Sequence, residues 1–417
     1  MEKVITDIGF QYFTSQDYFI NQQLNSWLPS LRRIGATAVV FSAGFDFAVP
    51  EDVIQCAINN QLKPIVHFTT TLPTAQYFGE ISYLFDLYKK WGVESVILGD
   101  KPNIRDSWGM VEWHHEDLVN QFLNRFVPLA QHSVEVGLPP VFPPLQPGGE
   151  FWDTAFLELA LEGLIKRQVL DVLDDLMLSS YGYTFNKPLT WGRGGPERWS
   201  ISKPYSTPEG QEDQLGFYNF EWMQVVSQKV TRKNLPVMIL DAGSPGKGNS
   251  ENYLESVNKI LNACQKGQSN GGRIGDELEI NGSVASCVFS LDTLEKSHDG
   301  KLDISTLEKI FGHHSVQEKI DVSHDSNKKL LHHYLLLPKH ESGVSDVVLN
   351  KIRPFIKKYQ PTIGFSLDEA SLAQKVSIFP DPLLFTTTEI NQLRSTGCVV
   401  QVLPESGIDI ATSLQES

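Results

Sequence analysis

The sequence has few cysteines and no excess of basic residues. Its 417 residues include only four cysteines, at positions 56, 264, 287 and 398. They lie far apart and form no C-x-x-C motif, so neither a zinc site nor a disulfide framework is indicated. Lysine and arginine total 35 against 50 acidic residues, a formal net charge of -15. That balance argues against a nucleic-acid partner, because phosphate binding needs a concentrated basic face.

Membrane, cofactor and metal signals are missing as well. No apolar run reaches membrane-spanning length, so we expect no membrane association. There is no G-x-G-x-x-G motif, Gly243 to Gly248 lacks phosphate-loop spacing, and the adjacent histidine pairs do not match H-E-x-x-H, so no cofactor and no metal are expected. Met1 to Ile5 enters the first apolar run without a signal peptide, which predicts a cytoplasmic protein, or a secreted one if a signal has been removed.

The sequence does contain a regular alternation of short apolar runs and longer amphipathic segments, from residue 4 to about residue 290. This alternation is typical of βα units and a parallel sheet. Strands are expected at 4–12, 38–42, 64–68, 95–98, 140–144, 176–181, 237–240 and 284–289. Helices are expected between them, for example at 24–34, 51–60, 80–91, 118–135 and 151–170. Eight such units predict a (β/α)8 TIM barrel rather than an open doubly wound sheet.

A smaller α/β unit is predicted after the barrel. A charged, histidine-rich stretch at 296–329 is expected to hold a final helix and a linker. Strands are then expected at 331–337, 362–365, 376–379 and 399–403, with helices at 347–358 and 387–395. We therefore divide the chain into a barrel at 1–311, a linker at 312–329 and a small α/β domain, a Rossmann-like half, at 330–417. Ser366 has capping-box spacing to Glu369 and is expected to begin a short helix.

One connection, residues 184–214, is unusually long and rich in glycine, proline and tryptophan. Long connections inside compact domains are usually functional or disordered, and the tryptophans argue against disorder. We expect this segment to fold over the mouth of the barrel after the sixth strand.

The first functional signal is a carboxylate at the end of the seventh strand. Asp241 follows the apolar run at 237–240 and precedes a glycine turn at Gly243. An apolar run that ends on an acid fits a strand that delivers one side chain to the loop-lined mouth of a barrel. The alternative is a solvated acid that opens a turn.

The fourth strand ends with Val96-Ile97-Leu98-Gly99-Asp100-Lys101-Pro102-Asn103. This segment resembles the strand-four signature of the clan A glycoside hydrolases, whose usual Asn-Glu-Pro carries the acid/base glutamate. The order of other features agrees over about residues 5 to 290: His67 ends strand three, Tyr181 and Tyr183 follow strand six, and residues 235–243 resemble the segment that carries the nucleophile. The resemblance implies a glycosidase-like barrel.

The acid/base position departs from that family. Lys101 stands where the glutamate would be, and Asp100 matches the preceding asparagine. Neighbouring side chains of a regular strand point to opposite faces, so Asp100 needs a local shift to take the role. The resemblance then implies Asp241 as nucleophile or base and Asp100 as acid. Two aspartates widen the gap between carboxyls by roughly 1–2 Å, which favours inversion, since inverting enzymes separate them by about 6.5–9.5 Å. Glu150 is another candidate partner, or a helix-start carboxylate.

Aromatic residues gather at the predicted strand ends, where flat rings can stack on the C–H faces of a sugar. Rings offer contact area at low entropic cost, so we expect a carbohydrate ligand at the C-terminal face of the barrel. The alternative is that these rings bury the long loops. The candidate substrate-binding residues are Tyr12, His67, Asn103, Arg105, Trp108, Glu150, Tyr181, Tyr183 and Trp191.

Three functions are therefore open. The first is a glycoside hydrolase-like barrel that binds a carbohydrate and hydrolyses a glycosidic bond with a carboxylate pair. The second is a catalytically inactive carbohydrate-binding barrel that has lost its acid/base residue to Lys101. The third is a flavin-dependent barrel oxidoreductase, because Gly92-Val93 and Gly99-Asp100 resemble the folate-reductase type; a yellow protein would favour it. By fold-level analogy, the C-terminal domain is expected to pack against the barrel or mediate homo-oligomerisation.

Overall fold

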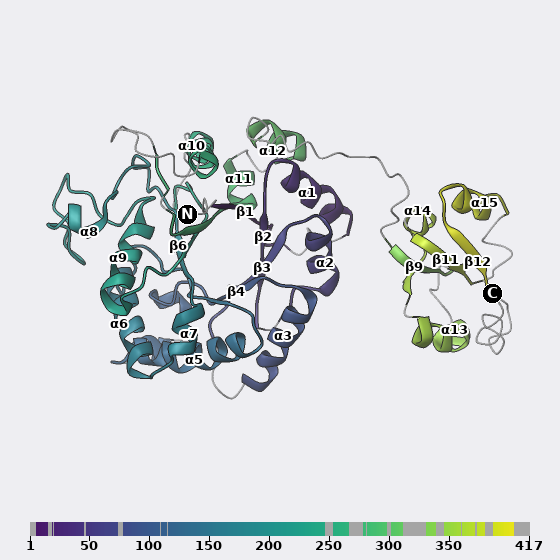
Figure 1. The fold of residues 1–417 in the computed structure, drawn as a ribbon, viewed down its shortest axis with the longest axis horizontal. Coiled ribbons are helices and arrows are strands. Elements are labelled where there is room, and N and C mark those ends of the chain that lie inside the picture. The colour runs from purple at the N-terminus through teal and green to yellow at the C-terminus, as the bar shows by residue number, and fades with distance from the viewer. Residues whose placement is uncertain are drawn as a thin grey trace. The chain divides into compact units, whose positions relative to one another are not determined.

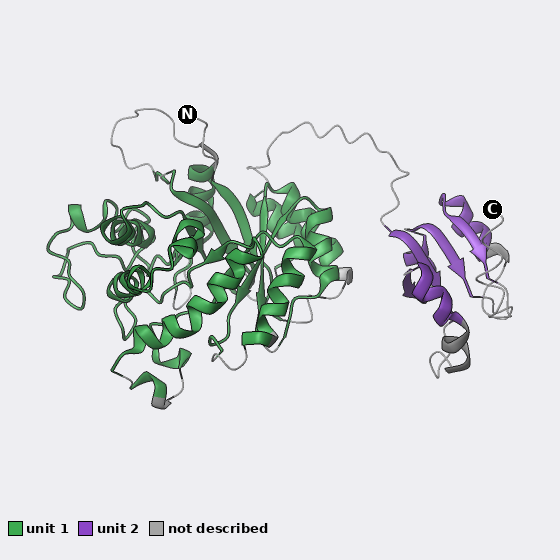
Figure 2. Ribbon diagram, turned by 60° about the horizontal axis from the view of Figure 1, so that its bottom comes forward, with its two compact units in different colours: residues 1–316 green, residues 317–417 purple. Residues whose placement is uncertain are grey.

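The computed structural model forms two compact units, Met1–Val316 and Gln317–Ser417 (Figure 2). It describes residues 6–15, 19, 21–45, 47–73, 78–108, 110–114, 116–246, 253–266, 278–280, 282–297, 302–311, 331–338, 346–359, 361–371, 373–379 and 387–403. The predicted linker at 312–329 lies outside these residues. None of the helices in the described part of the chain is long and apolar enough to cross a membrane.

The first unit is a (β/α)8 TIM barrel, as the alternation predicts. Eight parallel strands follow the order β5-β4-β3-β2-β1-β8-β7-β6, with helices around the outside (Figure 1). The strands are β1 (Asp7–Gln11), β2 (Ala38–Ala43), β3 (Lys63–Phe68), β4 (Ser95–Leu98), β5 (Pro140–Val141), β6 (Leu178–Tyr181), β7 (Val237–Leu240) and β8 (Val284–Ser290).

The barrel helices agree with the amphipathic segments in position. They are α1 (Asn21–Arg33), α2 (Glu51–Asn59), α3 (Phe78–Trp91), α4 (Met110–Trp113), α5 (Leu118–Glu135), α6 (Asp153–Lys166), α7 (Leu170–Asp175), α8 (Gly195–Arg198), α9 (Asn219–Thr231), α10 (Tyr253–Lys266), α11 (Leu291–Ser297) and α12 (Ile304–Phe311). The helix expected at 151–170 ends earlier, at Lys166, and a separate helix, α7, begins at Leu170. Gln168 between them has a φ of 58°, the left-handed conformation that ends a helix.

The fifth strand is shorter than predicted but still closes the barrel. Prolines lack the N–H that a sheet ladder needs, so the Pro-rich run at 139–144 keeps only the two-residue β5. Isolated parallel bridges join this run to β6, at Val141 with Met177 and at Leu145 with Ser180. Closure therefore rests on single bridges rather than on a continuous ladder.

Alternate residues of each strand face either the barrel interior or the surrounding helices. On β2, Ala38 and Val40 belong to the interior cluster, whereas Val39 and Phe41 pack in the larger core under the helices. The interior cluster is apolar and comprises Ala38, Val40, Ile65, Ile97, Val141, Tyr181, Tyr183, Met238, Leu240 and Val288. Because the same alternation holds along each strand, it also decides which polar residues reach the mouth.

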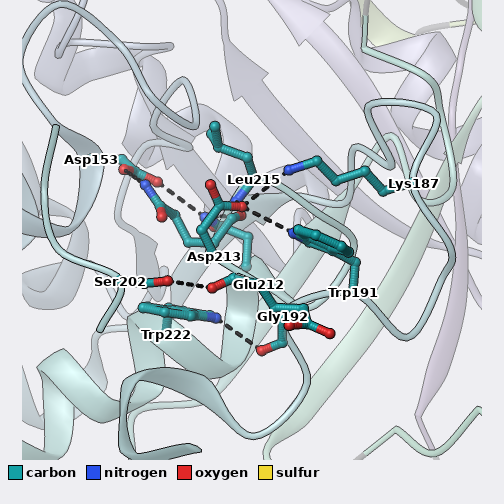
Figure 3. A network of polar contacts seen from close by, with 11 residues as sticks. Asp153, Lys187, Trp191, Gly192, Ser202, Glu212, Asp213, Leu215 and Trp222 are labelled. Carbon is teal, nitrogen blue, oxygen red and sulfur yellow. Dashed lines mark hydrogen bonds and ion pairs between the residues drawn. The ribbon is translucent and has the colours of Figure 1, made fainter. Parts of the chain in front are cut away.

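The long connection after β6 is organised by one carboxylate, Asp213. Its Oδ1 accepts hydrogen bonds from Lys187 Nζ at 3.2 Å, Trp191 Nε1 at 3.0 Å and the Leu215 amide at 3.0 Å (Figure 3). Gly192 has a φ of 77°, and a Cβ there would lie 2.4 Å from the Asp213 carbonyl oxygen. Only glycine fits at position 192, because the backbone passes so close to that of Asp213, which accounts for one of the glycines of the connection.

Much of this connection packs outward instead of over the mouth. Helix α8 lies beside α9 at the periphery of the barrel (Figure 1), and Trp222 on α9 donates from Nε1 to the Gly192 carbonyl at 2.9 Å (Figure 3). The expectation that the segment covers the mouth is wrong for these residues, because α8 and Gly192 contact α9 in the helix layer. Thr184 stays at the strand ends, where its amide donates to the Ser244 carbonyl at 2.7 Å.

A second buried carboxylate, Asp153 in the first turn of α6, ties α6 to that connection. Asp153 Oδ1 accepts from Gln214 Nε2 at 3.1 Å, and Oδ2 accepts from Asn219 Nδ2 at 3.0 Å. Asn219 Oδ1 in turn accepts from Ser180 Oγ on β6 at 2.6 Å. Burial raises the pKa of Asp153, although the bonds from Asn219 and Gln214 oppose the shift. The network joins β6, α6 and α9 through a desolvated acid.

The second unit is a four-stranded parallel sheet in the order β10-β9-β11-β12. Its strands are β9 (Leu331–Leu336), β10 (Thr362–Gly364), β11 (Ala373–Ile378) and β12 (Val399–Val402), and its helices are α13 (Asp346–Tyr359), α14 (Leu367–Ala370) and α15 (Thr387–Ser395). Two apolar clusters cover its faces, one reaching α13 and the other α14 and α15. The predicted cap is confirmed, since Ser366 Oγ accepts from the Glu369 amide at 3.4 Å.

We predict that Asp153→Ala lowers the free energy of unfolding of the barrel by about 2–4 kcal/mol, because it leaves the buried Gln214 Nε2 without its acceptor and Asn219 Nδ2 with only the Gln214 carbonyl oxygen. Urea denaturation followed by tryptophan fluorescence measures the loss. Glu162→Ala on the same helix is the control; it removes only an exposed pair with Lys166 and should cost less than about 0.5 kcal/mol. Equal losses in the two variants would contradict a structural role for the Asp153 network.

Candidate functional site

Polar side chains reach the barrel mouth at the C-terminal ends of β1, β2 and β3. Ser42 and His67 follow the inward-facing Val40 and Ile65 by two residues, so the pleat directs them inward as well. Gln11 joins them from β1, since its Nε2 donates to Ser42 Oγ at 3.3 Å. These side chains form a polar layer above the apolar interior.

Asp100 and Lys101 converge on Tyr181 from the neighbouring β4 connection. The Tyr181 hydroxyl donates to Asp100 Oδ1 at 2.5 Å. Lys101 Nζ lies 4.7 Å from the centroid of the Tyr181 ring and 3.8 Å from Asp100 Oδ2. Strand alternation predicted opposite faces for these two residues, and that expectation is wrong. Strand β4 ends at Leu98, and positive φ values at Gly99 and Lys101 turn the backbone between them.

Lys101 and Asp241 both adopt a left-handed backbone conformation, each with a φ of 47°. Three of the other left-handed residues, Gln61, Gln168 and Arg232, follow helices α2, α6 and α9, where such a conformation ends the helix. At a strand end the conformation costs roughly 1–2 kcal/mol for a residue with a Cβ. Strain of this kind tends to persist at functional sites, where it aims a side chain.

Asp241 is half-buried at the end of β7. Its Oδ1 accepts from Thr293 Oγ1 on α11 at 3.0 Å. Burial raises the pKa of Asp241, while hydrogen bonds from Thr293 and Ser244 and the charges of Lys101 and Lys296 oppose the shift. The net direction is upward, so Asp241 retains its proton to a higher pH than an ordinary aspartate.

Tyr181 and Tyr183 stack on each other beside these carboxylates. Their ring centroids are 4.7 Å apart with an interplanar angle of 10°. A Cβ on Gly246, which has a φ of 75°, would lie 2.9 Å from Tyr183 Cγ, so the βα7 backbone lies directly on that ring. Burial raises the pKa of both phenols well above the ordinary value. With 8% and 7% of their surface exposed, the two tyrosines offer hydroxyl groups rather than open ring faces.

His67 presents a fixed acceptor. Its Nε2 lies 3.2 Å from the Gly99 carbonyl oxygen, which can only accept, so Nε2 carries the hydrogen. Burial lowers the pKa of His67, against the opposing charge of Asp100, and the neutral ring therefore carries a lone pair on Nδ1. Nδ1 is buried without a hydrogen-bond partner among the residues that the structure describes.

Two of the candidate substrate-binding residues have structural roles. Tyr12 is the neighbour of inward-facing Gln11 and so faces the helix layer, where it is fully buried against Phe13 and Phe41. Asn103 is also fully buried; its Nδ2 donates to the Gln146 and Phe151 carbonyls at 2.8 and 2.9 Å, and its Oδ1 accepts from the Gln146 amide at 2.8 Å. In this structure neither side chain is available to a ligand.

The remaining candidates lie around the mouth without converging on Asp241. Trp108 donates from Nε1 to the Pro102 carbonyl at 2.7 Å, and its ring faces the Arg125 guanidinium at 5.1 Å. It lines a small cavity of about 20 Å³ together with Asp100 and Arg125. Arg105 and Glu150 are exposed on their connections, and Trp191 belongs to the Asp213 network. In the described part of the chain, no group of His, Cys, Asp and Glu side chains is arranged to hold a metal ion.

No protein-family model and no curated protein sequence matches the chain. Solved structures with a similar fold include a GH5 family lichenase from Caldicellulosiruptor sp. F32, with 10% identity, coverage of 74% of this chain and 92% of that chain, and a TM-score of 0.42. The GH39 enzyme from Xanthomonas axonopodis pv. citri is 12% identical over 69% of this chain and 58% of that chain, with a TM-score of 0.42. Fructose-bisphosphate aldolase from Plasmodium falciparum is 9% identical over 75% of this chain and 89% of that chain, with a TM-score of 0.38. Similarity at this level concerns the barrel fold, and function must be argued from the site.

Several residues of the site were not singled out in the sequence. Gln11 and Ser42 could have been found by counting two residues on from the apolar interior positions of β1 and β2. Thr293 gave no such signal, because its contact with Asp241 crosses from α11 to β7. Tyr253 on α10 is also close enough for the Asp241 charge to raise the pKa of its phenol, after the larger effect of burial.

We predict that Asp241→Asn stabilises the barrel at neutral pH, by about 1 kcal/mol. The folded-state pKa of Asp241 is raised, so its stabilising effect is fully present below the ordinary aspartate pKa and is lost as the pH rises through the raised value. The gain in the free energy of unfolding from Asp241→Asn should therefore grow as the pH rises from the ordinary aspartate pKa to the raised one, and then level off. Urea denaturation at a series of pH values measures it. Asp175→Asn, an exposed acid on α7, should show no such pH-dependent gain.

Proposed function

We propose that the barrel binds a carbohydrate at its C-terminal mouth and hydrolyses a glycosidic bond there, with Asp241 and Asp100 as the carboxylate pair. The observation that carries the proposal is the placement of two carboxylates in unlike environments around one pair of stacked tyrosines. Tyr181 donates to Asp100 at 2.5 Å, and the phenols of both Tyr181 and Tyr183 respond to the charge of Asp241. Pairs of titratable groups whose environments separate their protonation are typical of acid/base chemistry.

The environments divide the work between the two acids. The pKa of Asp241 is raised by desolvation, so we assign Asp241 as the general acid that protonates the leaving oxygen. Asp100 faces the Tyr181 hydroxyl with one oxygen and the Lys101 ammonium with the other, so it acts as the carboxylate that assists attack on the sugar. This assignment exchanges the roles that the glycosidase resemblance implies.

The polar layer around the pair supports recognition of sugar hydroxyls. Lys101 adds a donor beside Asp100, with its Nζ 3.8 Å from Asp100 Oδ2. Gln11 and Ser42 extend this polar layer across β1 and β2. A polyhydroxylated ligand matches this mixture of donors and acceptors better than an apolar one.

We predict that Asp241→Asn slows hydrolysis by at least about 100-fold for glycosides with poor leaving groups and far less for dinitrophenyl glycosides, which need no protonation. Asp100→Asn should slow both classes alike. Because the active form of Asp241 carries its proton, the wild-type rate should fall as the pH rises through its raised pKa. Steady-state assays on matched phenyl and dinitrophenyl glycosides measure these effects. Equal, background-level turnover by wild type and Asp241→Asn would overturn the hydrolytic role.

A second candidate function is carbohydrate binding without hydrolysis. It is favoured by Lys101, which occupies the position of the acid/base glutamate in the glycosidase resemblance. The Lys101 ammonium lies 3.8 Å from Asp100 Oδ2 and pairs with that carboxylate. For this function we predict sugar binding by wild type with no turnover of any glycoside. Tyr181→Phe should weaken that binding by roughly tenfold, because it releases Asp100 from its hydrogen bond. Isothermal titration calorimetry with a sugar that the wild type binds measures the change in affinity. An unchanged affinity in Tyr181→Phe would exclude the Asp100 and Tyr181 site.

A further inference from the structure

Two aromatic side chains meet at the rim of the same end of the barrel. Trp152 directly precedes α6 in the βα5 connection, and Tyr205 lies in the βα6 connection. Their ring centroids are 4.9 Å apart and their planes meet at 51°, so they form an open aromatic corner. Tyr205 exposes 64% of its surface, which leaves most of its ring in contact with solvent.

The backbone of Tyr205 is in a conformation that favours glycine. Lys203 and Ser206 pair through both of their amides, at 3.2 and 2.9 Å, and enclose a two-residue turn of Pro204 and Tyr205. Tyr205 has a φ of 61°. A turn with proline first and a positive φ second is the kind that selects glycine or asparagine at the second place. A tyrosine there is strained, and since its ring is exposed, burial does not offset the strain.

The Tyr205 side chain is nevertheless fixed. Its hydroxyl accepts a hydrogen bond from the Trp152 amide at 2.7 Å and donates to the Glu150 carbonyl at 3.2 Å. These bonds hold the ring on the βα5 connection while its outer surface remains free. A strained, exposed and immobilised ring is a preorganised contact surface, because binding to it costs little further conformational entropy.

The aromatic corner is continuous with the mouth through the β4 and β5 connections. The Lys101 amide donates to the Pro144 carbonyl at 2.9 Å. Two residues further on, the Asn103 carbonyl accepts from the Phe151 amide at 3.0 Å, and Asn103 Nδ2 donates to the Phe151 carbonyl at 2.9 Å. A hydrogen-bonded rim therefore leads from Lys101 to Trp152.

We propose that Trp152 and Tyr205 form an outer carbohydrate subsite that stacks on one sugar ring of an oligosaccharide extending from the mouth along this rim. The proposal rests on the carbohydrate-binding function proposed above and makes its ligand an oligosaccharide rather than a monosaccharide. Two tilted rings match the apolar C–H face of a pyranose. The exposed carboxylate of Glu150, on the same connection, can accept from the hydroxyls at the edge of that sugar.

Tyr205→Gly is the sharpest variant, because it removes the ring and relieves the turn at the same time. We expect it to weaken oligosaccharide binding by about tenfold. Trp152→Ala should weaken oligosaccharide binding to a similar extent. Both variants should bind the matching monosaccharide within about twofold of wild type. Tyr83→Ala, which removes a tyrosine of 63% exposure on α3, is the control and should bind like wild type.

The experiment is a screen of the wild-type protein on immobilised oligosaccharides, followed by calorimetric titration of each variant with the best binder and its monosaccharide. Wild-type affinity retained in Tyr205→Gly, or equal losses for oligosaccharide and monosaccharide, would overturn the outer subsite. If Tyr181→Phe weakens binding in the same series while Tyr205→Gly does not, the mouth remains the site and only the subsite fails. If wild type binds no sugar, the proposed function fails and the subsite with it.

Discussion

Closure of the parallel sheet is the constraint on which the rest of the barrel depends. Once the strands form a ring, each successive residue must face either the interior or the helices, and the inward-facing residues at the strand ends reach the same mouth. The single bridges between the β5 run and β6 complete that ring in spite of the prolines. They set β6 beside the β4 and β5 connections, which is what allows Tyr181 to reach Asp100.

Two desolvated carboxylates of the barrel, Asp153 and Asp241, have opposite consequences. Asp153 has its oxygens occupied by neutral amides of Gln214 and Asn219, and it fastens the βα6 connection to the helix layer. Asp241 is half-buried in a left-handed turn at the mouth, where its partners are the hydroxyls of Thr293 and Ser244. Asp153 therefore serves the architecture, whereas a carboxylate held in a strained turn at the mouth can serve chemistry.

The strands, most helices and the identity of Asp241 as a strand-end residue could be predicted because they follow from hydrophobic periodicity alone. The prediction failed wherever the backbone leaves regular geometry. Alternation put Asp100 and Lys101 on opposite faces, but Gly99 and Lys101 have positive φ values and turn both residues toward Tyr181. The same periodic argument, carried one step further, would have placed Gln11 inward and Tyr12 outward. Contacts such as Thr293 with Asp241 depend on tertiary placement and leave no local signal.

The left-handed residues of the C-terminal face suggest a common principle for this barrel. Lys101, Asp241 and Tyr205 each carry a side chain where a glycine would be easier to accommodate, and each projects a charged or aromatic group from a connection rather than from a strand. Strain at one such position could be incidental to a loop. Lys101 lies at one end of the hydrogen-bonded rim along the β4 and β5 connections, and Tyr205 is bonded to Trp152 at its other end. If the groups at the two ends of this rim contact one extended ligand, preorganisation acts on a single binding event.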